Sequence, residues 1–123
     1  MKRILVIEDE QDLREALQTK LTADGYIVET VETSEQGLQS VLDEKPDLIL
    51  LDVMTHSLHA ETFLKRLRDL PEGKNDSKVI ILTNLDNDIT RDKVMKYTVD
   101  GYYVKAETPL TTISEKTREV LGI

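Results

Sequence analysis

Residues 48–52 read Leu48-Ile49-Leu50-Leu51-Asp52, a run of four aliphatic side chains that ends in a carboxylate. A short and continuous apolar run is typical of a strand that helices cover on both faces, as in a parallel sheet. Two similar runs, Ile4–Ile7 and Val79–Leu82, also lead into polar residues. The sequence therefore predicts a buried parallel sheet whose strands end in chemically active side chains.

Further strands and helices are indicated on either side of these runs. Tyr26–Val31 and Tyr102–Val104 have the length and the residue types of strands. Between the strands, apolar residues recur at helical spacing, so each strand is expected to be followed by a helix. The whole chain, residues 1–123, is thus predicted to form one α/β domain of five βα units, a three-layer α/β/α sandwich.

The expected helix boundaries come from residues that start or stop helices. Asp24-Gly25 should end the first helix, and Thr33-Ser34 should begin the second. The fourth helix, roughly Asp88 to Tyr97, has a ragged apolar stripe, which predicts weak packing. The fifth is expected to be capped by Thr108, with Pro109 at its first helical position.

Composition excludes several classes of protein. The 123 residues include no cysteine, which rules out disulfide scaffolds, thiolate metal sites and thiol nucleophiles. A formal charge of −8 argues against binding of nucleic acid by this domain and favours a cation or another protein as the partner. The sequence contains neither a signal-peptide core nor a membrane span, so a cytoplasmic protein with no membrane partner is expected.

Polar side chains stand at the carboxyl ends of four predicted strands. Glu8 and Asp9 follow the first strand, Asp52 the third, Thr83 the fourth and Lys105 the fifth. Ligands of such sheets bind beyond these strand ends, so the side chains are expected to converge. Three crowded carboxylates repel each other unless a cation lies among them, and oxygen ligands with open positions favour Mg²⁺.

The same residues indicate phosphoryl chemistry. Lys105 can place a positive charge on a phosphoryl oxygen, Thr83 can donate a hydrogen bond, and the metal can neutralise charge that develops during transfer. Because no serine or cysteine stands beside a base in this site, the nucleophile is expected to be a carboxylate. Asp52, held rigidly behind its aliphatic run, is the best candidate.

These residues, in this order, resemble the receiver domain of bacterial response regulators over essentially the whole chain. The similarity lies in Ile7-Glu8-Asp9, Leu51-Asp52-Val53-Met54, Leu82-Thr83 and Tyr102-Tyr103-Val104-Lys105. The resemblance implies a five-stranded, flavodoxin-like sheet of strand order 2-1-3-4-5, in a receiver (phosphoacceptor) domain that covers residues 1–123. Such a domain is not a conventional enzyme, although it assists its own phosphoryl transfer and autodephosphorylation.

The resemblance also implies how the acceptor and the metal are arranged. Asp52 would accept a phosphoryl group from a phosphohistidine on a sensor histidine kinase or a histidine phosphotransfer protein. Mg²⁺ would be held by Asp9, Asp52 and the backbone carbonyl of Met54. Glu8 would act on the metal largely through water.

A conformational switch is implied as well. Thr83 and Lys105 would hold the phosphoryl group, and Tyr102 would turn inward as Thr83 moves toward it. The surface of the fourth helix, fifth strand and fifth helix would then gain or lose affinity for a downstream output protein or domain. A phosphorylation-dependent homodimer is one form that such a partner could take.

The loop after Asp52 departs from the usual family pattern. His56 and Ala60 stand where proline and glycine are usual, so the loop backbone and the Met54 carbonyl could be placed differently. His56 and His59 could also form a metal-binding pair or act as pH sensors. Solvated loop histidines are the preferred interpretation.

Three further positions differ from the family pattern. Asn84 replaces a small residue beside the phosphate, which could change the lifetime of the phosphoryl group in either direction. Ala106 replaces a proline that often follows a cis peptide bond, so this loop could be trans. Thr98-Val99 replaces Gly-Ala after the fourth helix, which removes an easy left-handed cap and could make the output surface unusual.

Two other functions are alternatives to the phosphorylation switch. One alternative is a receiver fold that signals by protein binding alone, without phosphorylation. An aspartate-based phosphatase is disfavoured because it would need a second carboxylate two residues after the nucleophile, where Met54 stands. The sequence leaves open whether the chain is whole or part of a longer regulator. A chain acting alone would signal by docking to another protein or by relaying its phosphoryl group.

Overall fold

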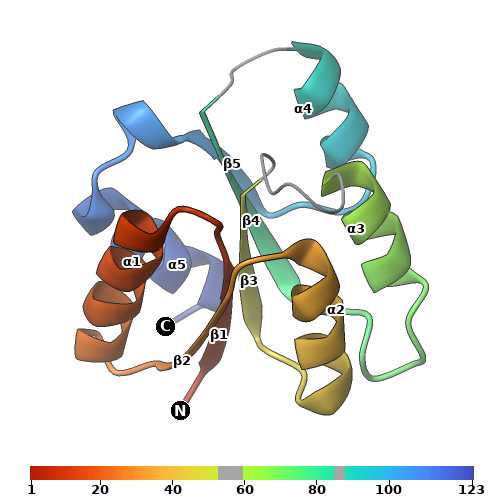
Figure 1. Cartoon of the computed structure of the whole chain (residues 1–123), viewed down its shortest axis with the longest axis horizontal. Coiled ribbons are helices and arrows are strands. Elements are labelled where there is room, and N and C mark those ends of the chain that lie inside the picture. Colours follow the sequence, from red (N-terminus) through yellow and green to blue (C-terminus); the bar gives the residue numbers. More distant parts are fainter. Residues whose placement is uncertain (53–59, 85–87) are drawn as a thin grey trace.

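The computed structural model describes residues 1–52, 60–84 and 88–123, in which strands and helices alternate as the sequence predicts (Figure 1). None of the described helices is long and apolar enough to cross a membrane. A short 3-10 helix, η1 (Lys105–Glu107), follows the last strand. The strands are β1 (Arg3–Ile7), β2 (Ile27–Val31), β3 (Leu48–Asp52), β4 (Lys78–Thr83) and β5 (Gly101–Val104), and the helices are α1 (Gln11–Ala23), α2 (Ser34–Asp43), α3 (Ala60–Arg68), α4 (Asp88–Met95) and α5 (Leu110–Leu121).

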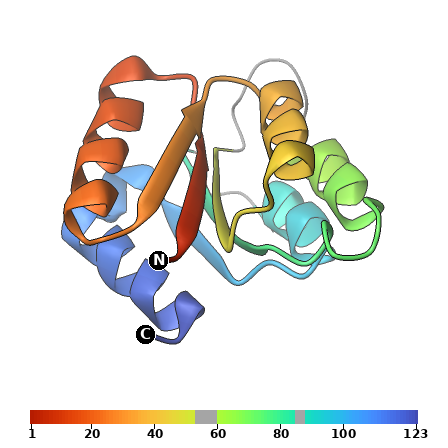
Figure 2. The ribbon, with the colours of Figure 1, turned by 90° about the horizontal axis from the view of Figure 1, so that it is seen from below.

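The strands form one parallel sheet in the order β2-β1-β3-β4-β5. The predicted three-layer fold and strand order are confirmed. Helices α1 and α5 cover one face of the sheet, and α2, α3 and α4 cover the other, as Figures 1 and 2 show. Because the helices after β1 and β3 lie on opposite faces, a site can open between the ends of these two neighbouring strands.

Two apolar clusters, one on each face of the sheet, hold the layers together. Leu17 and Leu21 of α1 and Ile113 of α5 pack in one cluster, and Phe63 and Leu67 of α3 pack in the other. Alternate residues of β1, β3 and β4 supply the two clusters, so these strands are buried on both faces, as their aliphatic runs predict. Each fully buried side chain of this kind contributes about 1.5–3 kcal/mol.

Local chemistry explains where the helices begin and end. The Thr33 side chain accepts from the backbone of Gln36 in a complete capping box at the start of α2. Gly25, with φ of 100°, follows α1 as predicted. The predicted start of α5 is wrong by one residue, because Pro109 is the N-cap rather than the first helical residue. The Thr108 hydroxyl does not cap α5 and donates instead to a carbonyl of β5, 2.7 Å away.

Thr98 adopts a left-handed conformation after α4, with φ of 59°, and no other non-glycine residue in the described ranges has a positive φ. The expectation that threonine would remove the left-handed cap is therefore wrong. The guanidinium of Arg68 in α3 donates to the carbonyls of Tyr97 and Thr98, at 3.1 and 2.9 Å, which holds this turn in place. Arg68 also donates to the carbonyls of Asn75 and Ser77, so it ties the turn after α4 to the loop after α3.

Replacing Thr98 with glycine is expected to stabilise the protein, because the left-handed conformation costs a side-chain-bearing residue roughly 1–2 kcal/mol. The greater entropy of glycine in the unfolded chain offsets part of this gain, so we expect the free energy of unfolding to rise by about 0.5–1 kcal/mol. Urea denaturation measures this free energy of unfolding. Thr111→Gly, in the first turn of α5, is the matched control and should lower the same quantity, since glycine is a poor helix former. A Thr98→Gly protein less stable than the parent would contradict the strain argument.

Candidate functional site

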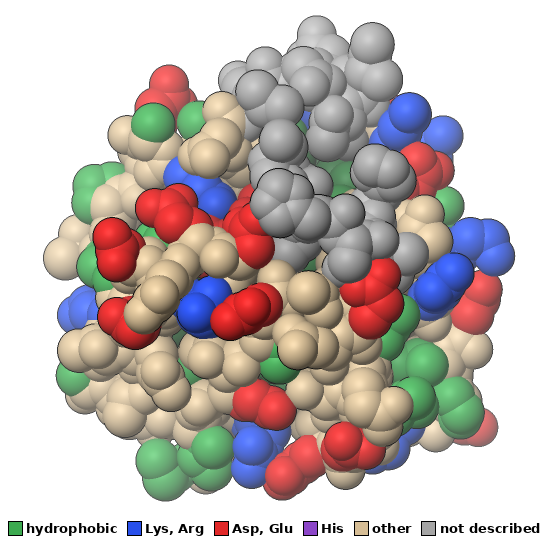
Figure 3. Space-filling model, in the orientation of Figure 1, with side chains coloured by type: hydrophobic (Ala, Val, Ile, Leu, Met, Phe, Trp, Pro, Cys, Tyr) green, Lys and Arg blue, Asp and Glu red, His purple; other side chains and the backbone are tan. Residues whose placement is uncertain are grey.

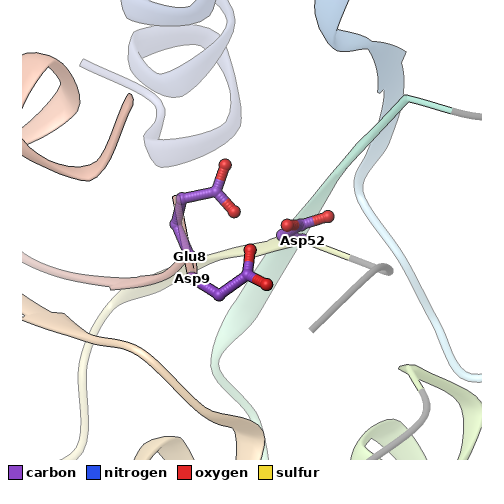
Figure 4. A group of neighbouring side chains, drawn as sticks. All are labelled: Glu8, Asp9 and Asp52. Atoms are coloured by element: carbon purple, nitrogen blue, oxygen red, sulfur yellow. The ribbon is translucent and has the colours of Figure 1, made fainter. Parts of the chain in front are cut away.

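Strand register brings the chemically active side chains to one edge of the sheet. The last residue pair of β1 and β3 places Glu8 beside Asp52. Thr83, the last residue of β4, pairs with the residue that precedes Lys105. Figure 4 shows the carboxyl groups of Glu8 and Asp9, at the end of β1, converging with that of Asp52 from β3. The structure therefore brings together three carboxylates from two separate sequence motifs.

Lys105 bridges two of these carboxylates. Its Nζ lies 2.5 Å from Glu8 Oε1 and 3.0 Å from Asp52 Oδ2. All three side chains are almost buried, with 10% of Lys105, 2% of Glu8 and 3% of Asp52 exposed. Solvent screens such ion pairs weakly, and loss of one partner would leave an uncompensated buried charge. The lysine thus joins the end of β5 to the ends of β1 and β3.

The cluster holds more negative charge than Lys105 balances. Burial raises the pKa of Glu8 from 4.5 to about 8, and the neighbouring Asp52 carboxylate acts in the same direction. Burial opposes the charged form of Lys105, but its contacts with Glu8 and Asp52 outweigh burial and raise the pKa of the ammonium group. A proton on Glu8, or another cation in its place, relieves the remaining repulsion.

The three carboxylates offer a site for a hard cation. One oxygen from each of Glu8, Asp9 and Asp52 lies within 4.8 Å of the other two. The second oxygen of Glu8 is buried without a hydrogen-bond partner among the described residues, and a cation-bound water could satisfy it. Oxygen donors combined with retained water are the coordination that Mg²⁺ prefers, so the donor set fits this ion. Acidic side chains, with basic ones among them, lie on the described surface beside the undescribed residues (Figure 3).

Tyr102 and Tyr103 pack on opposite faces of the sheet, because successive side chains of a strand alternate between its faces. Tyr102 joins the cluster under α2, α3 and α4, and Tyr103 joins the cluster under α1 and α5. Arg91 of α4 places its guanidinium carbon 5.5 Å from the centre of the Tyr102 ring, within the range of a cation–π contact. Thr83, in the neighbouring strand, is fully buried. Tyr102 therefore contacts α4 from the strand next to Thr83.

The departures from the family pattern have different outcomes. Met54, His56 and His59 lie outside the described residues, so the metal-binding carbonyl and the histidine hypotheses stay predictions. Ala106 lies in η1, and the described residues contain no cis peptide bond, which confirms the trans alternative for this loop. The lysine before Ala106 still reaches both carboxylates. Ala60, the first residue of α3, has no positive φ.

Sequence reasoning missed Arg14 of α1. Its Nη1 donates to the backbone carbonyls of Glu8 and Asp9, which carry two of the converging carboxylates. The signal was present in the helical pattern, because Arg14 precedes the buried Leu17 and Leu21 at intervals of three and seven residues. A charged residue on the apolar stripe of a helix indicates a specific partner within the fold.

The sequence of this chain matches a known protein family. The family model for the response regulator receiver domain matches residues 4–115. Response regulator ArlR of Staphylococcus aureus is 36% identical over 107 residues, which make up 85% of this chain and 46% of ArlR. The chain spans about half the length of the curated relatives that it matches.

Solved structures share the fold. A CheY-like response regulator receiver domain protein from Methanospirillum hungatei JF-1 has a TM-score of 0.90 and 24% identity, covering 99% of this chain and 94% of that one. The receiver domain of sensor histidine kinase PA1611 from Pseudomonas aeruginosa PAO1, solved with a magnesium ion in its active site cleft, has a TM-score of 0.87 and 20% identity, covering 99% and 98%. At these identities the likeness shows the fold alone.

Glu8→Gln tests how the carboxylate cluster is protonated. Because the folded protein holds the Glu8 proton more tightly than the unfolded chain does, the stability that this proton contributes is complete below pH 4.5 and is lost as the pH rises toward 8. In metal-free buffer we expect the neutral glutamine to leave the free energy of unfolding close to that of the parent near pH 5. At pH 8 it should raise this free energy by on the order of 1–3 kcal/mol.

Urea denaturation at several pH values measures this difference. Glu44→Gln is the control, because Glu44 is an exposed partner of Arg3 at the far end of β1 and should show no such pH-dependent gain. A Glu8→Gln protein less stable than the parent at pH 8 would rule out the proposed protonation.

Proposed function

This chain belongs to the response regulator receiver domain family of two-component systems, and on that premise we propose that it is a phosphoacceptor whose acceptor residue is Asp52. The observation that carries the proposal is the position of Asp52. It ends a fully buried strand, stands beside two further carboxylates and lies 3.0 Å from the ammonium group of Lys105. A carboxylate held rigidly in this way is suited to act as a nucleophile.

The transfer step uses this chain mainly to position groups and balance charge. An oxygen of Asp52 attacks the phosphorus of a phosphohistidine, so that a P–O bond forms as the P–N bond breaks and the leaving imidazole takes up a proton. Lys105 carries its charge to a phosphoryl oxygen, and the Thr83 hydroxyl donates a hydrogen bond to another. Water later cleaves the acyl phosphate, so that the phosphoryl group leaves as inorganic phosphate and Asp52 returns to its carboxylate form.

Mg²⁺ is the cation that fits this function. Asp9 and Asp52 would hold it directly, Glu8 would act largely through water, and Met54 would supply a backbone carbonyl. When bound, Mg²⁺ neutralises negative charge on the carboxylates and on the incoming phosphoryl group. Support comes from the three carboxylate oxygens within 4.8 Å of one another and from the magnesium ion in the PA1611 receiver domain.

The proposed switch runs from Thr83 through Tyr102 to α4. Movement of Thr83 toward the phosphoryl group makes room for the Tyr102 ring to turn inward. Such a turn would break the contact between this ring and Arg91, worth roughly 0.5–1 kcal/mol at an exposed site. Val94 is the one buried side chain among residues 91–95 of α4, so this part of the helix is thinly anchored. A change at Tyr102 can therefore alter the surface of α4, β5 and α5.

The partners follow from the same chemistry. The phosphoryl donor is a phosphohistidine on a sensor histidine kinase or a histidine phosphotransfer protein. The altered surface is read by an output protein or domain, or by a second copy of this chain. Contact with nucleic acid by this domain is not part of the proposal, because its formal charge is −8.

Intact mass measurement tests the acceptor. After incubation with Mg²⁺ and a small phosphodonor, the parent chain should gain the mass of one phosphoryl group, and Asp52→Asn should gain none, because an amide lacks the nucleophilic oxygen anion. Asp43→Asn, at the exposed end of α2, is the control and should behave like the parent. An adduct retained by Asp52→Asn would contradict the assignment of Asp52 as the acceptor. No adduct on the parent, from either a small donor or a kinase, would favour the receiver that acts by binding alone.

Thermal unfolding with and without Mg²⁺ tests the cation. An ion that binds the folded protein raises its stability, by about 2.7 kcal/mol at a hundredfold excess over Kd. We expect a Mg²⁺-dependent rise in the Tm of the parent and its near loss in Asp9→Asn. Asp12→Asn, in the exposed first turn of α1, should keep the rise. An equal rise in Asp9→Asn and the parent would place the ion elsewhere.

A further inference from the structure

Arg14, in the first turn of α1, contacts the backbone that carries two of the proposed cation ligands. Its Nη1 donates to the carbonyl oxygens of Glu8 and Asp9, at 3.1 and 3.4 Å. Its Nη2 lies 3.4 Å from a carboxylate oxygen of Glu32. The Arg14 side chain is 15% exposed, whereas that of Glu32 is 65% exposed. A largely buried guanidinium is thus held between the Glu8–Asp9 segment and an outer carboxylate.

The carbonyls of Glu8 and Asp9 lie just beyond Ile7, the last residue of β1, and Arg14 donates a hydrogen bond to each of them. On the other side, the backbone N–H of Glu8 donates to the carbonyl of Val31 in β2, at 3.1 Å. The segment is therefore held from β2 and from α1. Because the orientation of the peptide planes decides where each Cα–Cβ bond points, these contacts set the direction of the two carboxylates.

We propose that Arg14 is a positioning residue of the cation site, acting through the Glu8–Asp9 backbone to favour Mg²⁺ over a larger divalent ion. The inference rests on the proposed function of this site as a cation site. Mg²⁺ demands near-ideal octahedral geometry, whereas Ca²⁺ tolerates longer and more variable distances. Residues that orient metal ligands typically change metal affinity by 10–100-fold. Arg14 therefore strengthens binding of Mg²⁺ more than binding of Ca²⁺.

The positive charge of Arg14 and its positioning role have opposite effects on cation binding. A guanidinium near the site repels any cation, and Glu32 offsets this repulsion in part. If charge alone mattered, Arg14→Met would strengthen binding of both ions alike, and Arg14→Lys would match the parent. If Arg14 positions the backbone, Arg14→Lys should weaken Mg²⁺ binding as Arg14→Met does. A single ammonium group lacks the planar fork that reaches the carbonyls and the carboxylate together. The two roles therefore predict changes of opposite sign in the Mg²⁺ affinity of Arg14→Met.

Calorimetric titration of the full chain with Mg²⁺ and with Ca²⁺ provides the test. We expect Arg14→Lys and Arg14→Met to weaken Mg²⁺ binding about tenfold and Ca²⁺ binding less, so that the preference for Mg²⁺ falls. Arg3→Lys is the matched control, because Arg3 stands at the other end of β1 and pairs with the exposed Glu44 at 2.9 Å. It should leave both dissociation constants unchanged.

Glu32→Gln is a second variant, which serves also if an Arg14 variant fails to fold. Loss of one outer negative charge alone would weaken the binding of both ions alike. If Glu32 also holds Arg14 in place, its loss lowers the preference for Mg²⁺, and this is the result we expect. An unchanged preference in these variants overturns the positioning role, as does tighter Mg²⁺ binding by Arg14→Met. A parent chain that binds no Mg²⁺ overturns the cation site itself and this inference with it. That failure is seen in the parent chain, whereas failure of the positioning role is seen only in the variants.

Discussion

The buried ends of two neighbouring parallel strands carry more carboxylate than one lysine can neutralise. Glu8 and Asp52 are 2% and 3% exposed, so neither side chain can turn into solvent to escape the other. Lys105 is bound to both and relieves part of the repulsion. The remainder is relieved by a proton on Glu8 or by an added cation. The burial of these carboxylates at the strand ends is therefore the feature of the fold on which the proposed cation site depends.

Keeping this unfavourable cluster buried requires stability from elsewhere in the chain. Buried ion pairs are often neutral or destabilising relative to apolar residues of similar size. The apolar clusters on the two faces of the sheet supply the compensation, and β1 and β3 contribute to both. Gly37 of α2 lies so close to Ile7 that any side chain there would meet it. Helix α2 thus packs closely against the side chain of Ile7, the last residue of β1 before Glu8, which links core packing to the site.

The sheet and the edge where its active side chains meet were predictable from sequence because parallel register is regular. Buried strands leave aliphatic runs, and the first polar residues after Ile7 and Leu51 must then lie at the same edge. The left-handed Thr98 was not predictable, because its carbonyl is held by Arg68, 30 residues away in sequence. The position of Arg14 on the apolar stripe of α1 indicates burial, but not that its partners are the carbonyls of Glu8 and Asp9. Periodicity shows which residues are buried, but not which distant donor satisfies a carbonyl.

Within the described residues 91–98, the attachments of α4 and of the turn that follows it differ in strength, and this difference constrains how the helix can respond to the site. Arg68 donates to the carbonyls of Tyr97 and Thr98 just after the helix and to two further carbonyls of the loop after α3, so the carboxyl end of α4 is held by several bonds. Nearer its amino end, the cation–π contact between Arg91 and Tyr102 is a weaker attachment. A turn of Tyr102 removes the weaker attachment and leaves the stronger one in place. Motion of α4 would then be a tilt about its carboxyl end rather than a shift of the whole helix.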